Sequence, residues 1–349
     1  MRFFPIPKQD LLLGLCCLPA LIAIWLAGFT FDRLPAAGLV ASGALTLAFG
    51  ANKTWGGSSF SLLFTTTLGI AFSSWLGCVT GDILPLYILV AMLYAAVYVT
   101  MANVDESAWW MLLQWSIAYL VSGYYAGSLA HATDRAMLVG SGGLIQIFFL
   151  YLVFRRYPFC LKDVWPRAWL RFLRVTTGKY KHKIHLQWSV FFALLAMGLA
   201  LSAVEFFQLK NGYWAGMTLL ICLRNNYRDS LSRVRARVSG TLLGSVTAAA
   251  LIDLCHSPLY LIGGFMLFGY LAFTWSYSLV AKSYFILALL VTMMVVFMIA
   301  SLGNSQLAVA THRLEATAIG GLFALFALVM ARLVTRKQIL LRRAGKNPG

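Results

Sequence analysis

The sequence has very little charge for its length. Only 11% of its 349 residues are charged, whereas 60% are hydrophobic. A soluble domain carries about 25% charged residues, because its surface must face water. The shortage argues against an ordinary soluble fold and indicates that most of the surface faces lipid.

Metal-binding, disulfide and catalytic patterns are also missing. The six cysteines form no CxxC pair and have no matching histidine spacing, so neither a zinc site nor a disulfide framework is expected. The chain has no Walker loop, GxSxG, HExxH or acidic metal motif, which argues against an enzyme and against nucleotide as an energy source. We therefore expect no catalytic residue, no metal and no cofactor. Any transport by this chain is therefore expected either to use an ion gradient or to be passive.

Long, continuous apolar runs fill the rest of the chain. A helix needs about 20 apolar residues to cross a bilayer, and lipid admits only helices or closed barrels. Because the runs do not alternate with polar residues, helices are favoured. The sequence thus predicts an all-α integral membrane protein with about twelve transmembrane helices. We place them at residues 10–28, 34–50, 58–78, 83–102, 107–129, 136–154, 186–207, 211–223, 238–254, 257–274, 279–301 and 314–334.

Basic residues predict the orientation of these helices. The chain has 28 Lys and Arg against 11 Asp and Glu. The Lys and Arg residues stand between and after the apolar runs. We therefore explain their excess by membrane topology and not by nucleic-acid binding. With a cytoplasmic N-terminus, all but Arg33, Arg135, Lys210 and Arg313 fall on the cytoplasmic side. The positive-inside rule then predicts that both termini are cytoplasmic.

One basic, polar segment divides the chain. Residues 155–185 carry nine Lys or Arg, with Asp163 as the only acid. Two readings stay open: an amphipathic helix lying on anionic lipid headgroups, or a plain cytoplasmic linker. The expected domains are a first six-helix membrane repeat at 1–155, a basic cytoplasmic linker at 156–185, a second six-helix repeat at 186–335 and a basic cytoplasmic tail at 336–349.

The two halves share sequence patterns at a nearly constant offset. Ala-Thr-Asp-Arg at 132–135 precedes Gly142-Gly143, and Ala-Thr-His-Arg at 310–313 precedes Gly320-Gly321, 178 residues later. Leu-Gly at 68–69 recurs at 243–244, an offset of 175. Six helices per unit is an even number, so both units insert the same way up. We predict parallel repeats related by a pseudo-two-fold axis along the membrane normal.

The second half carries the motifs of a known family. Tyr213-Trp214-Ala215 stands at a helix start and is followed by a basic loop and by Arg-x-x-Gly-Thr-x-x-Gly at 237–244. This resembles the fusaric acid resistance (FUSC) family of aromatic acid exporters, chiefly over 211–335. The resemblance implies proton-driven export of aromatic or other amphiphilic carboxylates across a bacterial inner membrane. It leaves open a periplasmic adaptor and a homo-oligomer as partners.

Arginines at membrane depth are the leading candidates for substrate binding. A charge there costs about 2.5–3.5 kcal/mol on insertion scales, so it suggests a function. Arg135 and Arg313 occupy equivalent repeat positions and would together bind a carboxylate. The alternative is that each reaches the outer interface or pairs locally with Asp134 or Glu315. Arg237 is either a carboxylate site at the cytoplasmic entry or a positive-inside anchor. Tyr213 and Trp214 complete the predicted substrate-binding set.

Two further groups have weaker assignments. Asp134 and His312 are equivalent positions beside arginines and, with Asp253, are candidate proton carriers. The alternative is that Asp134 and His312 are polar loop residues whose identities diverged between the two halves. Asp105 and Glu106 align with Lys282 and suggest an ion pair that gates the inner face, or else two solvated charges.

Three functions remain open from the sequence. The leading one is a secondary active exporter of organic anions. The second is a passive organic-anion channel, and the third is a membrane subunit of the envelope that transports nothing.

Overall fold

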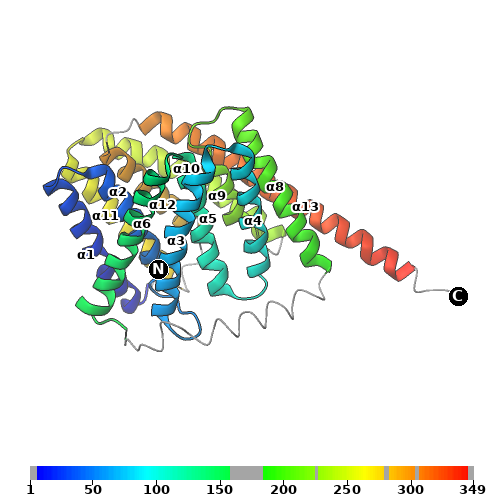
Figure 1. Cartoon of the computed structure of the whole chain (residues 1–349), viewed down its shortest axis with the longest axis horizontal. Helices are drawn as coiled ribbons and strands as arrows, with labels where there is room; N and C mark the ends of the chain where they lie inside the picture. Colours follow the sequence, from blue (N-terminus) through cyan, green and yellow to red (C-terminus); the bar gives the residue numbers. More distant parts are fainter. Residues whose placement is uncertain (1–5, 158–183, 225–226, 279–282, 303–305, 345–349) are drawn as a thin grey trace, which may run out of the picture.

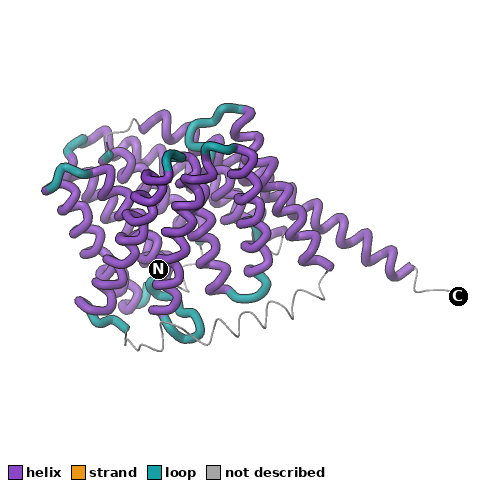
Figure 2. The backbone as a smooth tube through the Cα atoms, viewed as in Figure 1, coloured by secondary structure: helices purple, strands orange, loops and turns teal. Residues whose placement is uncertain are grey.

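The computed structural model describes residues 6–157, 184–224, 227–278, 283–302 and 306–344. Within these ranges the chain forms twelve α-helices and one short π-helix. They contain no β-strand, and β-pairing there is limited to one isolated bridge between Trp55 and Ser58. Figure 2 shows the helices as a single bundle. The all-α prediction is therefore confirmed.

The helix order can be followed in Figure 1. The first half contains α1 (Lys8–Thr30), α2 (Leu34–Gly50), α3 (Ser59–Gly81), α4 (Leu84–Met101), α5 (Glu106–Tyr124) and α6 (Leu129–Phe148), which continues into the π-helix η1 (Phe149–Val153). The second half contains α8 (Ile184–Phe206), α9 (Tyr213–Cys222), α10 (Tyr227–Leu254), α11 (Pro258–Tyr277), α12 (Tyr284–Ser301) and α13 (Gln306–Ala344).

The helices have the length and composition of membrane spans. Within the described residues, nine are long and apolar enough to cross a bilayer, and α2 and α9 are shorter apolar helices. Large hydrophobic side chains such as Leu26, Phe72 and Leu259 are more than half exposed, as expected for a surface that faces lipid. The chain is a multi-pass membrane protein.

Three helices begin at least seven residues earlier than the sequence predicts. α6 begins at residue 129 and not 136, α10 at 227 and not 238, and α13 at 306 and not 314. The prediction started each span after its charged residues, whereas Arg135, Arg237 and Arg313 are buried inside the helices. α13 also runs through the expected boundary at 335/336 to Ala344, and its end projects from the bundle (Figure 1). Most of the predicted linker, residues 158–183, lies outside the described residues.

Helices pack in matching ways in the two halves. In the first half, α6 packs against α2 and α3, and α3 against α5; in the second half, α13 packs against α9 and α10, and α10 against α12. Contacts between the halves include α4 with α8 and α1 with α11. Within each half, a glycine allows two helices to approach closely. A Cβ on Gly142 of α6 would lie 1.8 Å from the Val40 carbonyl oxygen of α2, and a Cβ on Gly320 of α13 would lie 2.2 Å from the Ala215 carbonyl oxygen of α9.

Candidate functional site

Arg313 is the most unusual buried residue in the described structure. It is fully buried on α13, and its guanidinium carbon lies 4.0 Å from the ring centroid of Trp214 on α9. None of its three side-chain nitrogens has a hydrogen-bond partner. A desolvated cation–π contact contributes about 2 kcal/mol, which does not replace the hydrogen bonds that a guanidinium normally makes. Arg313 therefore presents unused donors to an incoming anion.

Arg135, which the sequence pattern pairs with Arg313, is better satisfied. It is buried in the second turn of α6, and its Nε donates to the Ser122 hydroxyl at 3.1 Å. Its guanidinium carbon lies 4.9 Å from the ring centroid of Tyr125, just beyond the end of α5. Arg135 is thus anchored by its own half of the protein.

Tyr213 connects the two arginines. Its ring centroid is 5.4 Å from that of Trp214 and 5.4 Å from that of Tyr124 in the first half. Both Arg135 and Arg313 lie within electrostatic reach of its hydroxyl. The structure therefore brings together four predicted residues, Arg135, Arg313, Tyr213 and Trp214, which we call the aromatic–arginine cluster. Sequence reasoning missed Ser122, Tyr124 and Tyr125, because nothing local marks them as neighbours of α6 and α9.

Arg237 lies in the same half as Arg313. It is 4% exposed in the third turn of α10, and its Nε has no hydrogen-bond partner. Another part of its side chain hydrogen-bonds with the Tyr284 hydroxyl on α12. Arg237 also interacts electrostatically with Arg313, so the two buried arginines are close enough to repel each other.

Two of the three candidate proton carriers, Asp134 and Asp253, are not brought into the cluster. Asp134 neighbours Arg135 in sequence, yet its side chain is exposed on the other side of α6, and Asp253 is exposed near the end of α10. His312 lies on α13, but its side chain is outside the described residues. Asp134 is part of a helix and not of a loop.

At the opposite end of α5, the predicted gating acids have different surroundings. The Asp105 carboxylate accepts the Ala108 N–H at 2.8 Å and so caps α5. Glu106 lies within electrostatic reach of Lys53 and Arg224. Burial lowers the pKa of Lys53, and Glu106 opposes that effect. The predicted partner Lys282 lies outside the described residues.

Arg224 is a second link between the halves at this end. Its guanidinium carbon lies 4.2 Å from the ring centroid of Trp109 on α5. Nearby, the Tyr98 hydroxyl on α4 donates to the Leu220 carbonyl at 2.7 Å.

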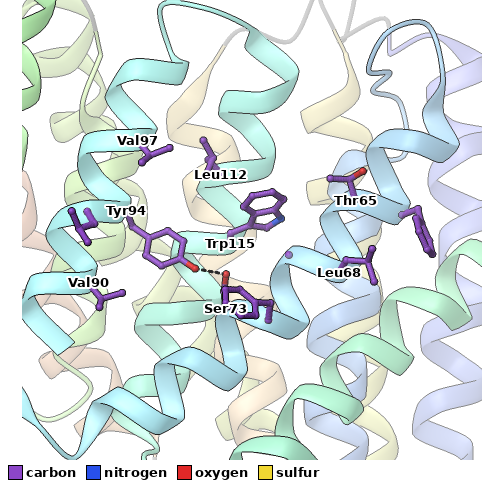
Figure 3. A pocket seen from close by; sticks show the side chains of 12 residues that line it. Thr65, Leu68, Ser73, Val90, Tyr94, Val97, Leu112 and Trp115 are labelled. Carbon is purple, nitrogen blue, oxygen red and sulfur yellow. Dashed lines mark hydrogen bonds between the residues drawn. The ribbon is translucent and has the colours of Figure 1, made fainter. Parts of the chain in front are cut away.

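A groove of about 750 Å³ lies between α3, α4 and α5. Figure 3 shows Trp115 and Leu112 behind it, and the hydroxyls of Ser73 and Tyr94 are 2.6 Å apart at its wall. Leu68 at its rim is more than half exposed, so the groove opens on the side of the bundle. Its lining carries no charged residue, and the aromatic–arginine cluster is therefore the better candidate for an anion.

The fold and the cluster define a polytopic membrane protein with buried cations against aromatic rings. Residues 199–327, which include Trp214, Arg237 and Arg313, match the family described as fusaric acid resistance protein-like. This match confirms the resemblance to that family over the second half, and the family points to a membrane efflux or transport role.

A curated relative adds little to this identification. An uncharacterized protein of Haemophilus influenzae (strain ATCC 51907 / DSM 11121 / KW20 / Rd) is 35% identical over 72 residues, which cover 21% of this chain and 9% of that protein. The chain thus matches less than a tenth of the relative's length. No solved structure matches the chain.

Proposed function

We propose that this protein exports aromatic or other amphiphilic organic anions across a bacterial inner membrane, using the proton gradient. The family match supports export, and the anion is argued from the site. One observation carries the proposal: Arg313 is fully buried, contacts Trp214 and has no hydrogen-bond partner on any side-chain nitrogen.

An aromatic carboxylate suits this site in two ways. Its two oxygens accept parallel hydrogen bonds from one guanidinium, which is the strongest geometry for such a pair. Its ring packs against aromatic side chains, which Trp214, Tyr213 and Tyr124 supply. Arg135 adds a second positive charge from the first half of the protein.

We also infer two parallel six-helix repeats with twelve crossings. Equivalent glycines support this inference: Gly69 on α3 lies against Trp115 on α5, and Gly244 on α10 lies against Thr292 on α12. These pairs are related by offsets of 175 and 177 residues. The reciprocal contacts of α4 with α8 and α11 with α1 are those that a two-fold axis produces. The excess of basic residues at one set of loops supports cytoplasmic termini.

A passive organic-anion channel is the second candidate. Active coupling to protons needs a titratable group that responds to the bound anion, whereas Asp134 and Asp253 are both exposed. This observation favours passive flow, and only transport measurements separate the two functions. A non-transporting envelope subunit is the third candidate, and it predicts that changes to Arg135 and Arg313 leave no phenotype.

The test is uptake of radiolabelled 4-hydroxybenzoate and related aromatic carboxylates into inside-out vesicles that contain the full chain. Each compound is measured with and without a protonophore. The R313Q variant removes the buried charge, and R33Q, which changes an arginine that is exposed, is the matched control.

Accumulation that collapses with the protonophore and in R313Q, but not in R33Q, is the expected result. Flux that equilibrates without accumulating supports the channel. Absence of flux for every compound refutes the transport of aromatic carboxylates by this chain.

A further inference from the structure

Unpaired polar groups are concentrated in one part of the described structure. Of the twelve described residues with an unpaired buried side-chain N or O atom, seven lie on three helices of the second half, and none of these seven is more than 6% exposed. The residues are Trp214 and Thr218 on α9, Arg237, Thr241 and Ser245 on α10, and Arg313 and Thr317 on α13. We call these seven residues the polar strip.

The members of the polar strip on each helix share one face. Successive members are four residues apart, a spacing that places side chains above one another on a helix. α13 packs against both α9 and α10, and α9 packs against α10. Gly320 lies against Thr218, and Gly321 against Val234, which is one turn before Arg237. The polar strip therefore lies where the three helices meet.

The threonine hydroxyls of the polar strip do not make the local hydrogen bond that other buried threonines in this protein make. Buried Thr residues in the other helices donate to the carbonyl four residues earlier, as Thr66 does to Leu62 at 2.7 Å and Thr292 does to Ala288 at 2.8 Å. This local bond is the usual way to satisfy a hydroxyl inside a helix. Thr218, Thr241 and Thr317 make no such bond, so their hydroxyls are available to something else.

Helix packing does not require these polar residues. The repeat offsets of 175 and 178 residues relate Arg237 to Leu62, Ser245 to Ile70 and Thr317 to Val139. These counterparts in the first half are apolar and buried. Two further counterparts are polar but are satisfied: Thr66, the counterpart of Thr241, donates to its own helix, and Arg135, the counterpart of Arg313, donates to Ser122. Among the described residues of α2, α3 and α6, Gln146 alone has unpaired buried side-chain atoms. The first half therefore has the same helix contacts without a series of such residues.

We propose that the polar strip is the route along which an anion crosses this protein. A carboxylate held by Arg313 passes along the hydroxyls of Thr317, Thr218 and Thr241 towards Arg237. The inference rests on the proposed transport of organic anions, and it places the route inside the second half and not between the halves. Two cations and a series of hydroxyl donors, with no acid among them, suit a monocarboxylate.

The route is closed in this conformation. Gly320 packs α13 directly on the Ala215 carbonyl of α9, and the members of the polar strip are almost completely buried. A carboxylate therefore enters only when α13 and α9 separate, and the glycine contact allows them to close again without a side chain between them.

The test is cysteine accessibility in the full chain, reconstituted in proteoliposomes after replacement of its six native cysteines. T317C and T241C report on the polar strip, and V139C and T66C are the matched counterparts in the first half. Each variant is treated with an anionic and with a cationic methanethiosulfonate reagent of similar size. We expect the anionic reagent to modify T317C and T241C at least tenfold faster than V139C and T66C, and 4-hydroxybenzoate to slow that reaction.

Equal, slow modification of all four variants overturns the route, even where 4-hydroxybenzoate is transported. Fast modification of the polar strip without transport of 4-hydroxybenzoate keeps the route and refutes the proposed substrate. If the cysteine-free protein does not fold, T241V and T317V in the native background replace it. They are expected to reduce anion flux at least fivefold, whereas T66V leaves it within twofold, and equal fluxes in all three variants overturn the route.

Discussion

Replacement of Arg313 by methionine should make the protein more stable and unable to bind its anion. A charge at membrane depth costs about 2.5–3.5 kcal/mol, and the Trp214 contact returns about 2 kcal/mol. Because no hydrogen bond offsets the remainder, the charge destabilises the folded state by about 1 kcal/mol. Methionine has a similar length and no charge, so R313M should recover this free energy.

Arg135 provides the matched control. R135M removes the same burial cost, but it also loses the contact with Tyr125, which is worth about 0.5–1 kcal/mol. It loses in addition a hydrogen bond from a charged group, which is worth about 1.5–3 kcal/mol, and it leaves the Ser122 hydroxyl without that partner. The two effects nearly cancel or slightly destabilise the protein. We therefore expect R313M to be about 1–2 kcal/mol more stable than R135M. For a chain of this size the difference corresponds to about 1–3 °C in Tm.

The assay is thermal unfolding of the detergent-purified full chain, with and without saturating 4-hydroxybenzoate. A ligand that binds only the folded state raises its Tm, so the compound should raise the Tm of the native protein and not that of R313M. A Tm for R313M that lies well below that of R135M would refute the reasoning. So would an undiminished stabilisation of R313M by 4-hydroxybenzoate.

Two further predictions concern packing and titration. G320A places a methyl group 2.2 Å from a carbonyl oxygen and should lower the free energy of unfolding by about 1–3 kcal/mol. The control G263A places its methyl group in open space and should not lower it; thermal unfolding of both variants checks this. The contact with Ser257 lowers the pKa of the Cys255 thiol, so its thiolate forms at a lower pH. Its alkylation by iodoacetamide should therefore reach half its maximal rate at a lower pH than that of an unperturbed thiol, and S257A should move that point upwards; an unchanged profile contradicts the assignment.

Local patterns in the sequence were sufficient to predict the class of protein. The continuous apolar runs require helices in lipid, because only internal hydrogen bonds satisfy the backbone there. The motif from Arg237 to Gly244 was sufficient to identify the family resemblance that the comparison then confirmed. The equivalence of Arg135 and Arg313 was also visible, since it depends only on the order of residues along the chain.

Hydropathy misplaced the helix starts for a physical reason. A charged residue normally ends an apolar span, and this expectation put Arg313 and Arg135 at the beginnings of helices. In the structure each lies in the second turn of a helix that starts earlier. Neighbouring helices bury these side chains, and a hydropathy average along one segment contains no information about its neighbours.

Only the tertiary structure decided which of these residues is free to bind. Arg135 finds Ser122 thirteen residues away, whereas Arg313 meets Trp214 about a hundred residues away and finds no acceptor. The polar strip likewise exists only because α9, α10 and α13 meet along those faces. Whether a buried polar group is satisfied depends on side chains from distant segments, and the sequence of one segment does not specify them.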